Sequence, residues 1–372
     1  MKGKSVITIF IVIVLSLSFQ TVLSKEIKFK KIDSKKFGFT TAEITALAFD
    51  NNNVLWICAR NQIFEYNGKR WIEHKEIFNH IDHLKNPKTG PCEMIVGGSF
   101  YARDIKVANN NHIWISTDFG LVEYDHKKWK LYSREFDATN FLNNEVKKEK
   151  RLERVVCFDI DNNNTVWAIF GSTIYILIDG KYEKYYSIFN KNAKKIIPRK
   201  FQFHCMDVKY KKKPFNDEYL IMGTSWGVLK FNIKNKTLRN LTPAFIEQPY
   251  PVYSINTYDN ETFWLISNNE IVKMKESKYN DDWTIATISK ILAFEKNLKF
   301  KHITKIFITP DNEKLLVVKN HNVGELYKYD DDSTELIFSL KTINSRSKIN
   351  DIEISNDNKI WLATDCGLFK SY

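Results

Sequence analysis

The stretch ITALAFDNNNVLW, residues Ile44–Trp56, decides the fold, because its pattern returns along the chain at a fixed spacing. In ARDIKVANNNHIW (Ala102–Trp114) and VVCFDIDNNNTVW (Val155–Trp167), a small or apolar residue is again followed by a tryptophan twelve positions later. The remaining copies are Val252–Trp264, Ile303–Leu315, Ile349–Trp361 and a longer one, Phe203–Ile221. A unit that recurs about every fifty residues is the signature of a repeat architecture.

Each copy begins with an alternating pattern. Positions four and six are apolar, as in Leu47 and Phe49 of the first copy and Ile105 and Val107 of the second, and Thr257 is the exception. Such alternation predicts a strand with one buried face. A turn rich in Asn, Asp and Lys follows, then a second strand that carries the tryptophan, a third strand and often an aromatic fourth. Asn tolerates the left-handed backbone, so these turns need few of the 13 glycines of this chain.

Seven units of four short antiparallel strands predict an all-β fold, a seven-bladed β-propeller. We expect residues 25–372 to form it, with blades that start near residues 44, 102, 155, 203, 252, 303 and 349. The last unit ends after its third strand, and the alternating segment 26–33 is expected to complete that blade. The helical alternative is limited to Asn143–Arg154.

The first 24 residues have the features of a secretory signal peptide. Lys2 and Lys4 precede the apolar run Val6–Leu17, and Val22 and Ser24 suit a cleavage site. The alternative is an uncleaved anchor, but the run is shorter than the roughly 20 residues that span a bilayer. We therefore predict an exported protein, periplasmic or extracellular, with no transmembrane segment after cleavage.

Composition excludes several classes of function. A chain that is 43% hydrophobic and 27% charged is not disordered. Its 56 Lys and Arg against 44 Asp and Glu are dispersed, which predicts a solvated surface and no nucleic-acid partner. The five cysteines form no CxxC motif, and His74, His80 and His83 are irregularly spaced, so we expect no metal and no cofactor. The pairing of the cysteines stays open.

The repeat resembles the two-component regulator propeller repeat, most closely in IWISTDFGL (Ile113–Leu121) and IWLATDCGL (Ile360–Leu368). The resemblance covers nearly all of residues 25–372, although Asn replaces the usual turn Gly and Ile221 and Leu315 replace the tryptophan. It implies a periplasmic, often glycan-responsive sensor propeller. No kinase or membrane segment is expected here, so the chain is similar to a stand-alone relative.

The fold predicts where a ligand binds. In a four-stranded meander the turns between second and third strands lie on the same face as the long connections 75–101, 133–154, 187–202, 242–251 and 289–302, and loops on a rigid scaffold commonly carry binding sites. We predict Trp226 and Phe119 as platforms for a sugar ring or an apolar ligand; the alternative is that they pack between blades. The polar ligand-binding candidates are Asp118, Arg60, Asp365, Arg103 and His321.

Catalytic motifs are weak. The string GTSWG (Gly223–Gly227) is followed by a predicted strand, whereas a nucleophile elbow requires a helix there. We therefore expect no catalytic residue and favour a non-enzymatic propeller that binds a glycan, another envelope ligand or a partner protein. Two alternatives remain: a secreted polysaccharide lyase or glycosidase that uses Asp118 and Asp365, and an envelope scaffold.

Overall fold

Each strand of the propeller pairs with its neighbour in sequence. The computed structural model describes residues 27–77, 101–142, 145–187, 201–210, 218–241, 251–257, 262–267, 270–275, 289–291, 301–309, 311–330, 333–344 and 346–372. Within these residues the strands form seven four-stranded antiparallel sheets and one hairpin. The predicted signal peptide, His80, His83 and much of the long connections lie outside the described residues.

The blades are numbered here in chain order. Blades 1 to 3 comprise β2 (Ala46–Phe49), β3 (Leu55–Ala59), β4 (Gln62–Tyr66) and β5 (Trp71–Glu73); β6 (Ala102–Val107), β7 (Ile113–Thr117), β8 (Gly120–Tyr124) and β9 (Trp129–Tyr132); and β12 (Cys157–Ile160), β13 (Val166–Phe170), β14 (Thr173–Ile178) and β15 (Lys181–Ser187). Blades 4 and 5 comprise β16 (Phe203–Tyr210), β17 (Glu218–Thr224), β18 (Gly227–Asn232) and β19 (Thr237–Asn240); and β20 (Val252–Thr257), β21 (Thr262–Ser267), β22 (Glu270–Lys275) and β23 (Ser289–Ile291).

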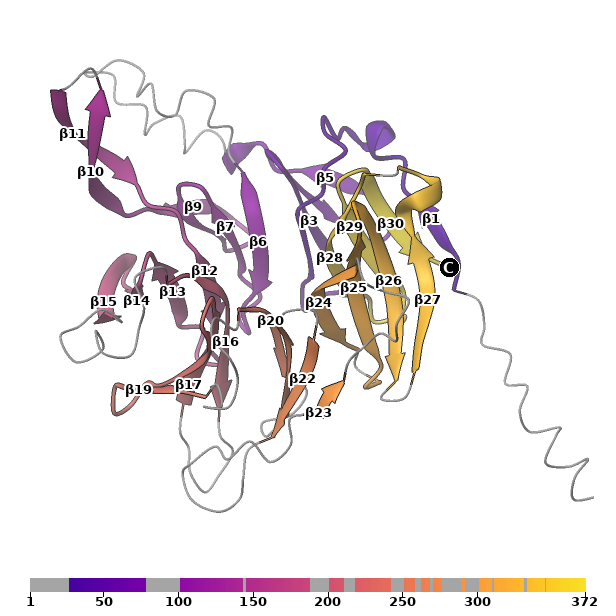
Figure 1. Cartoon of the computed structure of the whole chain (residues 1–372). Coiled ribbons are helices and arrows are strands. Elements are labelled where there is room, and N and C mark those ends of the chain that lie inside the picture. Colours follow the sequence, from indigo (N-terminus) through magenta and orange to yellow (C-terminus); the bar gives the residue numbers. More distant parts are fainter. Residues whose placement is uncertain are drawn as a thin grey trace, which may run out of the picture.

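Blades 6 and 7 complete the ring. They comprise β24 (Lys301–Ile308), β25 (Lys314–Asn320), β26 (Val323–Asp330) and β27 (Ser333–Ser339); and β28 (Ile349–Ile354), β29 (Ile360–Thr364), β30 (Gly367–Ser371) and β1 (Phe29–Lys31). The 3-10 helices of the described residues are η1 (Ser34–Phe37) and η4 (Leu340–Thr342). In Figure 1, β15, β19 and β27 lie at the rim, and the first strands of the blades lie toward the middle.

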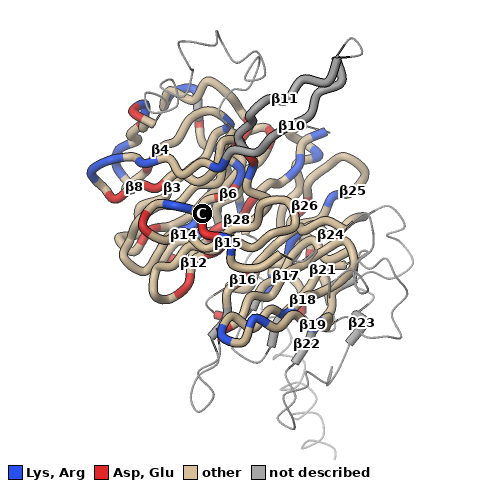
Figure 2. Tube along the Cα trace, turned by 90° about the vertical axis from the view of Figure 1, so that its left-hand side faces the viewer, with Lys and Arg blue, Asp and Glu red and all other residues tan. Residues whose placement is uncertain are grey.

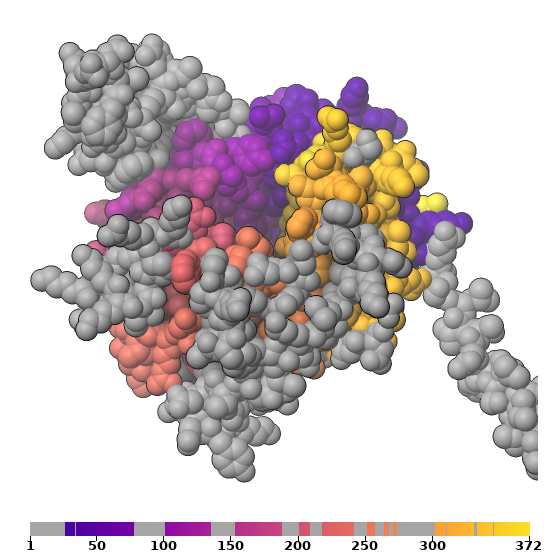
Figure 3. All heavy atoms as spheres, viewed as in Figure 1, coloured from indigo at the N-terminus to yellow at the C-terminus, as the bar shows by residue number. Residues whose placement is uncertain are grey.

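The N-terminal strand closes the ring, as predicted. β1 pairs antiparallel with β30, with Phe29 opposite Ser371 and Lys31 opposite Phe369. The N-terminal and C-terminal parts of the described chain therefore meet in one surface, indigo beside yellow in Figure 3. The prediction of a seven-bladed propeller closed by the N-terminal strand is confirmed.

Seven apolar clusters hold the ring together, one between each pair of adjacent blades. The repeated second-strand position contributes to every cluster and always packs on the following blade. Its residues are Trp56, Trp114, Trp167, Ile221, Trp264, Leu315 and Trp361, all buried. Burial of large apolar side chains is the main stabilising contribution here, and it lies between blades rather than within them.

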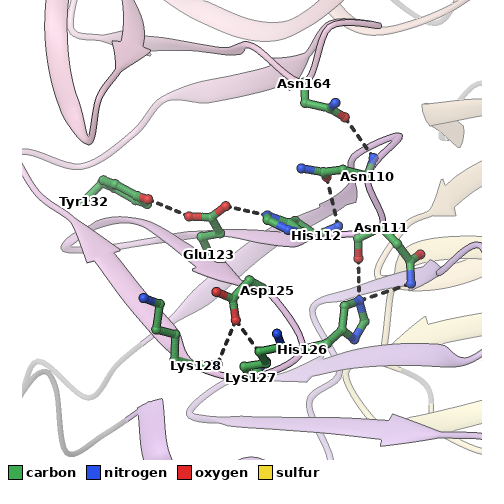
Figure 4. A network of polar contacts seen from close by, with 10 residues as sticks. All are labelled: Asn110, Asn111, His112, Glu123, Asp125, His126, Lys127, Lys128, Tyr132 and Asn164. Atoms are coloured by element: carbon green, nitrogen blue, oxygen red, sulfur yellow. Dashed lines mark hydrogen bonds and ion pairs between the residues drawn. The ribbon is translucent and has the colours of Figure 1, made fainter.

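Asn-rich turns on the opposite face from the predicted ligand face link neighbouring blades. Asn53, Asn111 and Asn164 have φ of 59°, 67° and 64°, in the left-handed region. Figure 4 shows the turn of blade 2, where the backbone N–H of Asn110 donates to Oδ1 of Asn164 in the next blade at 3.0 Å. In the same view, Glu123 contacts His112 Nδ1 at 2.7 Å and Tyr132 Oη at 2.5 Å. The predicted use of Asn in place of Gly is confirmed.

The connection between blades 2 and 3 differs from the prediction. It forms a hairpin of β10 (Glu135–Leu142) and β11 (Glu145–Leu152), with Glu135 opposite Leu152 and Leu142 opposite Glu145. The helical alternative for Asn143–Arg154 is therefore wrong, since a partner strand satisfies the backbone that a helix would satisfy internally. The hairpin projects beyond the blades in Figure 1. Among the described residues, no helix has the length and hydrophobicity needed to cross a membrane.

Candidate functional site

A β-bulge interrupts the inner strand of every blade at the second position of the repeat. The register shifts at this position in five blades, for example between Ala102 and Asp104 and between Val252 and Ser254. In blade 1 two consecutive residues face one: Ala46 lies opposite Cys58, and the N–H of Thr45 also donates to Cys58 O at 2.8 Å. In blade 3, Val156 and Cys157 face Ile169 in the same way. Bulges redirect the side chain of the extra residue and recur next to functional sites.

The inner strands surround a central cavity of about 680 Å³. Five bulge residues line it: Arg103, Val156, His204, Tyr253 and Thr304. Tyr253 is 50% exposed, and its ring lies 5.0 Å from that of His204, whose pKa is lowered by burial. Apolar side chains, among them Phe49 and Phe307, also line the cavity. The cavity thus combines aromatic, apolar and charged groups, as ligand sites commonly do.

Two carboxylates in the cavity each join three blades. Asp159 of blade 3 accepts from Lys106 Nζ of blade 2 at 2.8 Å and from Val208 N of blade 4 at 2.6 Å. Asp351 of blade 7 accepts from Lys305 Nζ of blade 6 and from Leu47 N of blade 1 at 2.9 Å. We call each set, a lysine, an aspartate and a backbone N–H from consecutive blades, a three-blade clasp. The clasps satisfy inner-edge N–H groups that no further strand pairs with.

Two other acidic residues line the cavity outside the clasps, Asp104 and Glu353. Burial raises the pKa of Asp104, and Lys106 opposes that rise. Burial, followed by repulsion from Asp351, raises the pKa of Glu353 to about 8. Each carboxyl is therefore held in surroundings that disfavour its charged form. Over the rest of the described trace, Figure 2 shows Lys and Arg interspersed with Asp and Glu.

Two predicted residues come together at the cavity. Nε and Nη2 of Arg103 donate to Oδ1 of Asp118 at 2.8 and 2.7 Å. The Arg103 guanidinium lies 4.9 Å from the centre of the Tyr101 ring, and the Tyr101 hydroxyl donates to Glu43 at 2.7 Å. Burial and this hydrogen bond raise the pKa of Tyr101 to about 12. The result is a polar network between blades 1 and 2 beside the cavity.

The two predicted platforms differ in exposure. Phe119 is 7% exposed and belongs to the apolar cluster between blades 1 and 2, so the structure places its ring in the core. Trp226 is half-buried in the turn between β17 and β18, where its backbone N–H donates to Thr224 Oγ1 at 3.1 Å. A ligand therefore has access to part of Trp226 and very little of Phe119.

The other predicted residues stand in turns of their own blades. Asp365 Oδ1 accepts from Asn350 Nδ2 at 2.9 Å, next to the bulge of blade 7. Arg60 and His321 are exposed, with φ of 49° and 54°, and Arg60 O accepts from Ala102 N at 3.0 Å. Arg60 also opposes the rise that burial causes in the pKa of Tyr101, which associates it with the Arg103 network.

The sequence reasoning missed the cavity-facing residues of the inner strands. Both faces of these strands line the cavity. Positions four and six, such as Phe49 and Val107, carry the predicted apolar residues, and positions three and five carry the residues that the reasoning missed. They include Asp104 and Lys106, Lys305 and Phe307, and Asp351 and Glu353. The occurrence of charges at these positions of otherwise apolar strands was the available signal.

The sequence matches no protein-family model and none of the curated proteins. Solved structures share the fold. The extracellular domain of the one-component system BT4673 from B. thetaiotaomicron has a TM-score of 0.61 and 15% identity over 92% of this chain and 40% of that chain. Virginiamycin B lyase from Staphylococcus aureus has a TM-score of 0.59 and 12% identity over 93% of this chain and 99% of that chain. YCF48 from Cyanidioschyzon merolae has a TM-score of 0.58 and 11% identity over 92% of this chain and 98% of that chain.

At these identities the likeness establishes the fold. This chain spans less than half of the BT4673 domain, 40% of its length. The propeller of extracellular two-component sensors, to which the repeat resemblance pointed, is therefore the architecture of this chain too.

Proposed function

We propose that this protein is an exported, non-enzymatic propeller that binds a ligand, in the manner of a stand-alone sensor propeller. The observation that carries the proposal is the central cavity of about 680 Å³ into which the bulge residues of five blades converge. A volume of this size suits a small molecule or a short segment of a partner. Export rests on the first 24 residues, and on the extracellular placement of the sensor domains that share the fold.

The half-exposed ring of Tyr253 is the best-placed contact surface of the cavity. Its neighbour His204 supports it from the adjacent blade, so the ring has little freedom to lose when a ligand packs on it. The Arg103–Asp118 pair offers donors and acceptors on another blade. Trp226 in blade 4 would extend the contact to a larger ligand such as a glycan, as would His321, Asp365 and Arg60 in the corresponding turns of blades 6, 7 and 1. Phe119 would support these residues from the core between blades 1 and 2 rather than touch the ligand.

A binding screen tests the proposal. Thermal shift and calorimetry of residues 25–372 against glycans, envelope extracts and small metabolites should identify a ligand. Tyr253→Ala should then weaken binding at least tenfold and Trp226→Ala by less. Tyr372→Ala, which removes a 69% exposed ring from the chain end, is the matched control and should bind like the wild type.

Two results would contradict the proposal. One is the absence of any ligand across the screen, and the other is unchanged affinity in Tyr253→Ala. Chromatography of the same mixtures tests the enzymatic alternative, because polysaccharide cleavage that is lost in Asp118→Asn or Asp365→Asn would replace binding by catalysis.

A further inference from the structure

The three-blade clasps show which cavity carboxylates lack a hydrogen-bonded lysine. In both clasps the lysine stands at the same repeat position as the aspartate, one blade earlier: Lys106 before Asp159, and Lys305 before Asp351. The corresponding residue is Ala46 before Asp104 and Phe307 before Glu353. Among the described residues, neither Asp104 nor Glu353 is therefore hydrogen-bonded to a lysine of the preceding blade, although Lys106 acts on Asp104 and Lys305 acts on Glu353 through space. Among the described residues, Asp104 accepts a hydrogen bond from the N–H of the adjacent Ile105 at 2.9 Å.

Blade 1 contributes only small side chains at these repeat positions between the two residues. It lies between blade 7, which carries Glu353, and blade 2, which carries Asp104, and its residues at positions three and five are Ala46 and Ala48. No side chain longer than a methyl group therefore enters the cavity from these positions. The two acids are near enough for Asp104 to contribute to the raised pKa of Glu353.

A buried hydroxyl provides an independent sign of a ligand. Ser116 is 4% exposed, lines the cavity and lies opposite Asp104 in the register of β6 and β7. Its hydroxyl has no hydrogen-bonding partner among the residues that the structure describes. Because Ser116 lines the cavity, a ligand atom there can hydrogen-bond to its hydroxyl.

We propose that the cavity binds an organic ammonium ion, with its charged nitrogen between Asp104 and Glu353 and within reach of the Ser116 hydroxyl. The inference rests on the proposed function and specifies its ligand class. The ammonium replaces the lysine that these two acids lack, and Phe49 and Phe307 provide apolar contact for the carbon skeleton. Arg103 does not compete for the acids, since it is paired with Asp118.

Calorimetry on residues 25–372 at pH 7 tests the inference. The probes are propylamine, putrescine and glucosamine, and their uncharged counterparts are propanol, butanediol and glucose. We expect the amines to bind and the counterparts to bind at least tenfold more weakly. The charged groups around Glu353 are Asp351, Lys305 and Asp104. Because Glu353 has a pKa of about 8, an ammonium should displace its proton, and the binding heat should change with the ionisation enthalpy of the buffer.

Variants locate the site. Asp104→Asn and Glu353→Gln keep the side-chain shapes and should each weaken amine binding at least tenfold, and Glu353→Gln should abolish proton release. Asp179→Asn is the matched control, because it neutralises an exposed turn carboxylate outside the cavity. Phe307→Lys should build a third clasp with Glu353 and block the amines. Thermal unfolding verifies that each variant is folded.

The outcomes separate the inference from the proposed function. Amine binding that is unchanged in Asp104→Asn and Glu353→Gln overturns the inference. A second result also overturns it: the amines fail to bind, whereas a neutral or anionic probe binds and loses its binding in Tyr253→Ala. In that case the proposed function stands. If no probe or screened ligand binds the wild type, both are contradicted.

Discussion

The repeated tryptophan differs from blade to blade in the hydrogen bonding of its indole nitrogen. Nε1 of Trp56 donates to Asp50 at 3.4 Å, and Nε1 of Trp167 donates to Asp161 at 3.1 Å. Nε1 of Trp361 is buried without a partner among the described residues, because Ser355 occupies the place of the aspartate six residues earlier. The packing of the ring followed from the sequence, whereas the hydrogen bonding of its N–H depends on the length of one turn side chain.

The double substitution Ser355→Asp with Asp357→Asn should therefore stabilise the protein. It gives blade 7 the Asp-Asn-Asn-Asn turn of blades 1 and 3 and supplies an acceptor to Trp361. One recovered hydrogen bond is worth about 1 kcal/mol, a rise of roughly 1–2 °C in Tm for a domain of this size. Differential scanning calorimetry measures it, with Asp357→Asn alone as the control. An unchanged or lower Tm in the double variant would contradict the explanation.

At the scale of the element, the Asn turns act as connectors between blades. Asn51 N donates to Oδ1 of Asn111 at 2.8 Å, Asn110 N to Asn164 at 3.0 Å, and Asn356 N to Asn53 at 3.1 Å. The accepting residue in each case has positive φ. Asn meets both requirements, the left-handed backbone and a side-chain acceptor, whereas Gly meets only the first. This accounts for the scarcity of glycine better than turn geometry alone.

Substitutions at Asn111 separate the two requirements. Asn111→Gly keeps the backbone accessible and loses the bond to Asn51, so it should lower the free energy of unfolding by about 1 kcal/mol. Asn111→Ala also places a Cβ in the left-handed region, at a further cost of about 1–2 kcal/mol. Urea unfolding should rank wild type above Gly and Gly above Ala. Equal stability of the wild type and the Gly variant would show that the side-chain bond contributes nothing.

For the whole molecule, local patterns predicted the blades and long-range contacts determined the site. Alternation and turn chemistry recur within each repeat, so the strands, their order and the closing segment were readable from the sequence. The clasps join residues far apart, such as Leu47 and Asp351, and no local pattern pairs them. The bulge that directs Tyr253 into the cavity and the burial of Phe119 depend likewise on neighbouring blades. The second strand of the hairpin, β11, was hidden by its lysine-rich sequence.

The closing strand is the point at which the whole ring can be tested. Ile32 N donates to Leu368 O at 2.8 Å, Tyr372 N to Lys28 O at 3.0 Å, and the Phe29 ring lies 4.7 Å from Phe338. A chain that starts at residue 34 loses these contacts and exposes the edge of β30. It should be less stable by about 1–3 kcal/mol from apolar burial alone and more prone to self-association through that edge.

Thermal unfolding and light scattering compare this truncation with residues 25–372. A synthetic peptide of residues 25–33 added in trans should restore Tm, since it can reoccupy the open edge in the register of β1. A scrambled peptide of the same composition is the control, because it keeps the charge and the hydrophobicity and loses the alternation that places Phe29 against Phe338. If the truncated chain is as stable as the longer one, blades 7 and 1 hold together through their own apolar cluster, and β1 only covers an edge.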